Sequence, residues 1–241
     1  MASSTGPEPL TMGLQEEIEC ALIKWPPSGN THFLPEDFMK SNVTTEKIRA
    51  LLDSKDHSKE NLAYISEKIS ESCKKLFVVL VYCKLVDIIF ELIREGITDE
   101  DLPFTRSSDI QDPFTRPSDT QANYVICRKS HKACQFTNHD HCAIQALGGL
   151  DISQRSQLQG AQWMVLAPIF KRDDPNKVPY FDLDQNTVMP FLQDGEGSPS
   201  LKRTGGFGEV WPVRIHRVHQ NIYCTPDAKV CQHHIELCRH F

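Results

Sequence analysis

The chain has 241 residues, of which 39% are hydrophobic and 24% are charged, and its net charge is −6 at pH 7. This length suits one large domain or two small ones, and the composition excludes both wholesale disorder and a membrane protein. The acidic balance argues against a protein that binds nucleic acid by neutralising phosphates. The most apolar stretch, residues 76–93, contains a lysine and two acids, which favours a buried helix over a membrane span.

The N-terminal residues and the cysteines indicate the cellular compartment of the protein. Residues 1–20 contain no basic segment followed by an apolar one, so no secretory signal is expected. Nine cysteines in a chain without an export signal favour reduced thiols. We therefore expect a cytoplasmic protein with no membrane partner.

Predicted helices follow a lead-in that prolines interrupt. Residues 1–35 are expected to be a flexible lead-in with one short amphipathic helix at 14–23, and residues 36–100 a helical domain. Thr44 or Thr45 can cap a helix that runs to about Ser54. Ser58 opens a second helix, whose apolar residues recur at helical spacing (Leu62, Ile65, Ile69, Cys73 and Leu76). Residues 76–93 are apolar nearly all round and should form the central helix, which Gly96 ends in a left-handed conformation.

Less regular segments follow the helical domain. Residues 101–121 are a duplicated linker, because PFTRSSDIQ at 103–111 returns as PFTRPSDTQ at 113–121. Residues 122–200 are a mixed segment with two apolar runs, at 162–170 and 188–192, and the first supplies core residues (Trp163, Met164 and Phe170). The expected fold is therefore a mainly α N-terminal helical bundle, an irregular α+β segment, and a short β-hairpin with a Cys/His-rich tail at 201–241.

The sharpest local motif is a glycine-rich turn at 204–211, TGGFGEVW. Glycines in such a hairpin let backbone amides approach phosphates closely, because a Cβ would block the approach. The protein-kinase pattern G-x-G-x-x-G-x-V places its last two glycines on Gly205 and Gly208 and its valine on Val210. Arg203 stands where the first glycine is expected. A simple glycine hairpin without a ligand remains the alternative.

Several segments resemble, in the right order, a family of fungal protein-kinase-like proteins. In that family an acidic helical region precedes the kinase domain, followed by a Gln-Trp-x-x-Leu-Ala-Pro-x-Phe segment, a Leu/Met-Pro-Phe segment and a glycine loop that runs into Val-x-Ile-His. The matching residues are 75–77, 101–104, 162–170, 189–191, 205–210, 213–216 and His219. The resemblance covers 36–223 and implies the start of a kinase N-lobe in 201–241, with nucleotide-binding positions at Gly205, Gly206, Phe207, Gly208 and Val210.

The residues that transfer phosphate do not follow this pattern. Phosphoryl transfer needs a strand lysine with a glutamate partner, a catalytic-loop Asp and Asn, and the Asp of D-F-G. The sequence contains neither H-R-D nor D-F-G, and Lys229 lacks the β-branched neighbours of a strand lysine. A glycine hairpin without the rest of the lobe would be a marginal two-stranded ribbon with open edges. We therefore expect an incomplete, non-catalytic kinase-like protein that binds ATP weakly and acts in regulation through protein–protein contacts.

Two groups of cysteines and histidines offer an alternative function. One lies at 127–142 (Cys127, His131, Cys134, His139, His141 and Cys142), and the other at 224–240 (Cys224, Cys231, His233, His234, Cys238 and His240). Neither contains the close cysteine pair typical of zinc sites, so zinc is not an expected cofactor, and on a helix the tail cysteines could be packing residues instead. The first group is the better candidate for a metal. The alternative is a small intracellular metal-binding or interaction module, or an accessory protein of a fungal biosynthetic locus without catalysis of its own.

Overall fold

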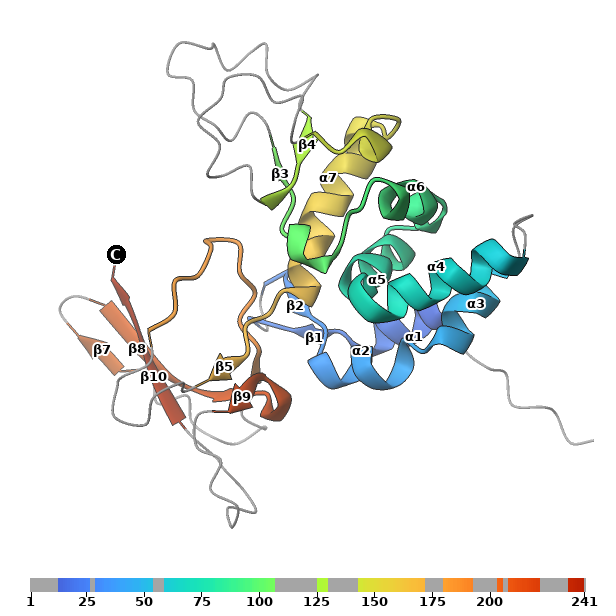
Figure 1. The fold of residues 1–241 in the computed structure, drawn as a ribbon. Helices are drawn as coiled ribbons and strands as arrows, with labels where there is room; N and C mark the ends of the chain where they lie inside the picture. Colours follow the sequence, from blue (N-terminus) through green and yellow to red (C-terminus); the bar gives the residue numbers. More distant parts are fainter. Residues whose placement is uncertain are drawn as a thin grey trace, which may run out of the picture.

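The computed structural model describes residues 13–26, 29–53, 59–106, 125–129, 143–171, 180–192, 203–205, 208–221 and 234–240. Over these ranges the fold is mainly helical, with one four-stranded sheet and a few two-stranded pairs. The helices gather at one end of the molecule, and the sheet that contains the C-terminal strands lies at the other (Figure 1). No helix in the described ranges is long and apolar enough to cross a membrane.

The helical part is built around α5. Its helices are α1 (Leu14–Ala21), α2 (Glu36–Asn42), α3 (Thr45–Asp53), α4 (Lys59–Ser72), α5 (Lys74–Tyr82) and α6 (Ile89–Arg94). All residues of α5 from Leu76 to Val81 are buried, because α1, α2 and α4 pack around this helix. The other helices are amphipathic and bury one face each. This arrangement confirms the predicted helical character of the N-terminal part.

Helices α3 and α4 begin where the sequence predicts. The backbone N–H of Lys47 donates to the Thr44 hydroxyl at 3.4 Å, which satisfies a donor in the first turn of α3. The predicted apolar face of α4 is buried, from Leu62 and Ile65 to Ile69. The same face continues into Cys73 and Leu76, which are also buried.

The predicted central helix at 76–93 is wrong in its length, because the chain turns after Tyr82. Lys84 has a φ of 59°, and the N–H groups of Lys84 and Leu85 donate back to Val81 (3.1 Å) and Leu80 (2.8 Å). This is a Schellman ending, a motif in which glycine usually occupies the left-handed position. A lysine there leaves no signal in the sequence. The chain resumes in the short 3₁₀ helix η1 (Val86–Ile88) and α6.

Gly96 ends α6 as predicted. Its φ is 74°, its N–H donates to Ile93 at 3.0 Å, and the N–H of Ile97 donates to Leu92 at 2.9 Å. The two helices of this segment therefore end in the same hydrogen-bonding motif, once with glycine and once with lysine.

Lys84→Gly is expected to raise the free energy of unfolding by about 0.5–1 kcal/mol. The substitution removes the steric cost of a side chain in the left-handed region, about 1–2 kcal/mol, and part of this gain is offset by the greater freedom of glycine in the unfolded chain. Urea denaturation followed by circular dichroism measures the change. Gly96→Ala is the matched control and should lower the stability by a similar amount, and a loss of stability in Lys84→Gly would contradict the account.

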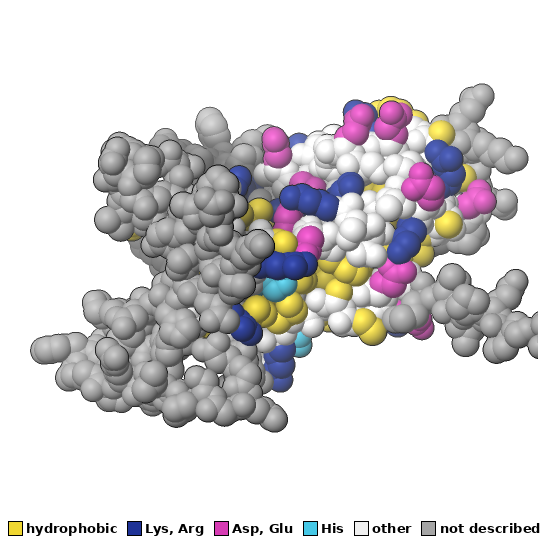
Figure 2. All heavy atoms as spheres, turned by 90° about the horizontal axis from the view of Figure 1, so that it is seen from below, with side chains coloured by type: hydrophobic (Ala, Val, Ile, Leu, Met, Phe, Trp, Pro, Cys, Tyr) yellow, Lys and Arg dark blue, Asp and Glu magenta, His cyan; other side chains and the backbone are white. Residues whose placement is uncertain are grey.

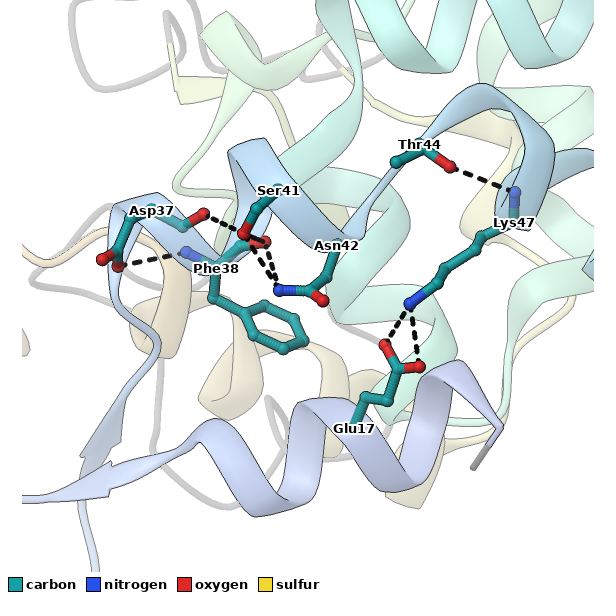
Figure 3. A network of polar contacts seen from close by, with 7 residues as sticks. All are labelled: Glu17, Asp37, Phe38, Ser41, Asn42, Thr44 and Lys47. Carbon is teal, nitrogen blue, oxygen red and sulfur yellow. Dashed lines mark hydrogen bonds and ion pairs between the residues drawn. The ribbon is translucent and has the colours of Figure 1, made fainter. Parts of the chain in front are cut away.

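Part of the predicted lead-in belongs to the core. Leu14 and Ile18 of α1 are buried, and α1 lies against α5. Glu17 of α1 accepts two hydrogen bonds from the Lys47 ammonium of α3, at 2.8 and 2.6 Å (Figure 3). Strands β1 (Ile23–Lys24) and β2 (His32–Phe33) then pair in antiparallel fashion. The core of the helical part therefore begins before residue 36.

The C-terminal sheet has β8 (Gly208–Ile215) at its centre. Strand β10 (His234–His240) pairs with β8 along one edge, from Gly208 to Arg214. Strands β7 (Arg203–Gly205) and β6 (Phe191–Leu192) share the other edge, β7 near the start of β8 and β6 near its end. The expectation of a two-stranded ribbon is therefore wrong, because both edges of β8 find partners for their backbone groups. Residues 234–240 form a strand, so the helical alternative for the tail cysteines does not hold there.

The remaining elements follow α6 in the chain, and among them α7 packs against α5 in the helical part. They are the 3₁₀ helices η2 (Asp99–Asp101), η5 (Gln145–Leu147), η6 (Gln162–Val165) and η7 (Arg217–His219), helix α7 (Ile152–Ala161), and the strand pairs β3 (Thr105–Arg106) with β4 (Ile126–Cys127) and β5 (Phe170–Lys171) with β9 (Gln220–Asn221). Met164 and Phe170 are buried, as the sequence predicts, and Trp163 is half-buried.

Candidate functional site

The helical part and the C-terminal sheet meet just after β8 ends. We call this contact the junction, and it consists of Phe33, Glu36, Pro168, Pro190, His216 and His219. The face of the molecule in Figure 2 shows acidic and basic side chains alternating over the helical part, without a large patch of one sign. At the junction an ion pair joins η7 to α2, with the Arg217 guanidinium 3.7 Å from the Asp37 carboxylate, beside the packing and hydrogen bonds described next.

His219 joins three separate segments of the chain. Its side chain is 1% exposed, and its Nε2 accepts a hydrogen bond from the backbone N–H of Glu36, the first residue of α2, at 3.2 Å. Since Nε2 acts as the acceptor, Nδ1 carries the proton and donates to the Pro168 carbonyl at 3.1 Å. A neutral imidazole thus bridges η7, α2 and the segment before β5.

His216 and Phe33 complete the packing around His219. The backbone N–H of His216 donates to the Pro190 carbonyl at 2.8 Å. The ring of Phe33, which is fully buried, contacts both histidines edge-on, with ring centroids 6.0 Å from His216 and 5.5 Å from His219. The two imidazoles lie 5.8 Å apart. One aromatic side chain of β2 therefore packs against both histidines that follow β8.

A second set of hydrogen bonds lies on the helical side. The Gln162 side chain forms two hydrogen bonds with the backbone of Phe104: Oε1 accepts from the N–H at 2.7 Å, and Nε2 donates to the carbonyl at 3.0 Å. The Asp99 carboxylate accepts from the N–H groups of Lys75 and Leu76 at 3.0 and 2.9 Å. Asp99 therefore caps α5, whose own N-cap residue makes no side-chain hydrogen bond.

The predicted nucleotide-binding residues lie at the other end of β8 from the junction. Gly205 is the last residue of β7 and pairs with Gly208, the first of β8, while Val210 pairs with Arg203 on one edge and Cys238 on the other. Gly206 and Phe207 fall outside the described residues. The strand pairing agrees with a hairpin, and one continuous strand connects it to the junction.

Burial is the largest influence on both junction histidines. It lowers the pKa of His219, although the hydrogen bond to Pro168 opposes the shift. Burial also lowers the pKa of His216, and the neighbouring His219 adds to that effect. Other charged groups act more weakly from α2, α5 and η7 (Glu36, Asp37, Lys75 and Arg217). Both imidazoles are therefore held in their neutral form.

The free energy of unfolding is expected to fall as the pH drops below about 6.5, the ordinary pKa of histidine. Between that value and the lowered native pKa, the unfolded chain binds more protons than the folded one, so stability rises with pH over this interval. Urea denaturation at a series of pH values measures the slope. His219→Gln keeps a donor and an acceptor but removes the titration, so its slope should be smaller, and an unchanged slope would contradict the assignment.

The two predicted metal clusters lie almost wholly outside the described residues. Cys127 is buried in β4, and for His234, Cys238 and His240 the structure gives only their backbone, in β10. Within the described ranges no group of three metal-ligating side chains comes together. Burial raises the pKa of the Cys83 thiol in the helical core to about 12, so this thiol is not a nucleophile at neutral pH.

Sequence reasoning found the histidines but missed their partners. The sequence places His216 and His219 in the motif that follows the glycine loop, whereas the structure shows them packing at the junction and, for His219, bridging three segments. Phe33 and Glu36 gave no signal, because they lie far from η7 in the sequence. Comparison of the chain with protein-family models, curated proteins and solved structures finds no match. A function is therefore inferred from the geometry of the chain and from its sequence motifs.

Proposed function

We propose that this chain is a kinase-like regulatory protein, in which a helical part holds a glycine hairpin that binds nucleotide weakly. It acts through protein contacts, and no phosphoryl transfer is assigned to these 241 residues because they hold neither H-R-D nor D-F-G. The observation that supports the proposal most is that the segments resembling the kinase-like family meet in space, although they are far apart in the sequence.

Five of these segments are joined to another by a hydrogen bond or by strand pairing (101–104, 162–170, 189–191, 213–216 and His219). Gln162 binds the backbone of Phe104, and Pro168 accepts from His219. The Met-Pro-Phe segment is joined to the Val-Arg-Ile-His segment twice, through Pro190 with the His216 N–H and through the pairing of Phe191 with Ile215. Residues of a shared motif are expected to form contacts of this kind when a fold depends on them.

The hairpin has the backbone chemistry that a phosphate requires. Glycines at the ends of β7 and β8 leave the backbone amides free of Cβ atoms that would hinder a close approach. Strand β8 runs from Gly208 to Ile215 and then enters the junction. A hairpin fixed at its far end to a packed core loses little further freedom when a ligand binds.

Thermal unfolding with and without millimolar Mg-ATP tests the proposal. A ligand at 100 times its Kd adds about 2.7 kcal/mol to the free energy of unfolding, so the melting temperature should rise measurably. Gly205→Ala/Gly208→Ala should unfold at a similar temperature without ATP and lose the shift. Gly149→Ala is the matched control, since a Cβ there meets no atom within 4 Å, and it should keep the shift. No shift in the natural chain, or equal shifts in both variants, would refute nucleotide binding at the hairpin.

A further inference from the structure

A groove on the helical part has features of a peptide-binding site. Its larger section is an open cleft of about 770 Å³, lined by residues on either side of β1, by β2, α5, α7 and η6, and by residues 185–189. Its lining contains no Asp, Glu, Lys or Arg. Three aromatic side chains, Trp25, Tyr82 and Trp163, face this section. All three are half-buried, so part of each ring is accessible to a ligand.

Amide side chains accompany the aromatic rings. Asn30, Gln157 and Gln185 line the cleft, are exposed, and make no side-chain hydrogen bond within the described residues. Each amide offers two donors and one acceptor. The cleft therefore combines flat apolar surfaces with hydrogen-bonding groups whose partners would come from solvent or a ligand.

The groove continues into a basic section. A neighbouring cleft of about 510 Å³ shares Leu22, His32, Tyr82 and Gln157 with the first, and it is also lined by Lys24 and Lys84. Both ammonium groups belong to exposed residues and form no ion pair with the described residues. Glu19, the acid in this section, accepts a hydrogen bond from Gln15 at 2.9 Å. One end of the groove is thus uncharged and aromatic, and the other carries two unpaired lysines in a protein of net charge −6.

We infer that this groove binds an extended, proline-containing peptide of a partner protein, with an acidic residue next to Lys24 and Lys84. A polyproline II segment makes no internal hydrogen bonds, so its carbonyls accept from amide donors, and its prolines pack on aromatic rings. The open shape lets a chain enter at one end and leave at the other. Charge complementarity places the acid of the peptide at the lysine end. This inference specifies a partner chemistry and does not depend on nucleotide binding at the hairpin.

Fluorescence polarisation with labelled oligoproline peptides tests the inference on the full chain. An oligoproline ending in Asp-Asp should bind, the same peptide ending in Lys-Lys should bind more weakly, and a Gly-Ser peptide ending in Asp-Asp should not bind. Trp163→Ala should weaken the first peptide about tenfold, which corresponds to about 1.4 kcal/mol. The matched control is Tyr64→Ala, which removes an aromatic side chain that is 55% exposed on α4 and does not line the groove, so it should bind as the natural chain does.

A charge-swap variant keeps the test independent of folding. Lys84→Glu changes an exposed residue, so the fold should remain, and binding of the acidic peptide should weaken about fivefold while binding of the Lys-Lys peptide improves. Equal binding of oligoproline and Gly-Ser peptides would overturn the inference and indicate attraction by charge alone. If neither Trp163→Ala nor Lys84→Glu alters binding, the peptide binds outside the groove, which would also overturn the inference. The Mg-ATP experiment on the hairpin is unaffected by either outcome.

Discussion

Phe33→Ala is expected to lower the free energy of unfolding by about 3–5 kcal/mol, the usual cost of truncating a buried phenylalanine. Phe33 is fully buried, packs with Ala167 and Val188, and contacts the rings of His216 and His219. The substitution leaves a cavity between the helical part and the sheet. Because both parts are rigid, they cannot move together to fill it. Urea denaturation followed by circular dichroism measures the loss.

Two further variants define what the loss in Phe33→Ala means. Tyr180→Ala removes an aromatic side chain that is 89% exposed and should change the stability by less than about 0.5 kcal/mol. Phe33→Leu keeps much of the volume but removes the edge-on ring contacts, so its loss should be intermediate. A loss below about 1 kcal/mol in Phe33→Ala would show that the junction contributes little to the fold.

Gln162→Ala should lower the free energy of unfolding by about 2–4 kcal/mol. Gln162 is 1% exposed and Phe104 is 3% exposed, so the substitution strands a buried N–H and a buried carbonyl away from water. Each unsatisfied buried group costs about 1–3 kcal/mol. The same denaturation experiment measures this loss.

Gln157→Ala is the matched control for Gln162→Ala. It removes the same type of side chain from α7, but Gln157 is exposed, so the change should stay within about 0.5 kcal/mol. Equal effects at the two positions would mean that the hydrogen bonds to Phe104 do not contribute to stability.

Local patterns in the sequence were sufficient for the N-terminal helical character and for some helix ends, but not for the end of α5 or for helix α7. Helix α4 could be predicted because its apolar residues recur at helical spacing, and the end of α6 because Gly96 can adopt a positive φ at low cost. The end of α5 could not, since Lys84 adopts the same conformation without a glycine. A run of apolar residues from 76 to 93 predicts burial equally well for one helix or for two helices separated by a turn.

Contacts between distant segments explain the other differences. The pairing of β8 with β6 and β10 joins residues far apart in the sequence, and β6 has only two residues, too few to show an alternating pattern. Phe33 lies in a segment whose prolines favour a loose lead-in, yet it packs at the junction. The segments that resemble the kinase-like family can be recognised in order along the sequence. The hydrogen bonds that join them form only in the tertiary structure.

Hydrogen–deuterium exchange with and without millimolar Mg-ATP tests the central claim most directly, because it reports on the hairpin and the helices in one measurement. The account predicts slower exchange for amides of β7 and β8, residues 203–205 and 208–215, when nucleotide is present. Exchange in α3 and α4 should stay the same, since these helices lie outside the junction. No change in β7 and β8, or an equal change throughout the chain, would contradict the proposed nucleotide-binding hairpin.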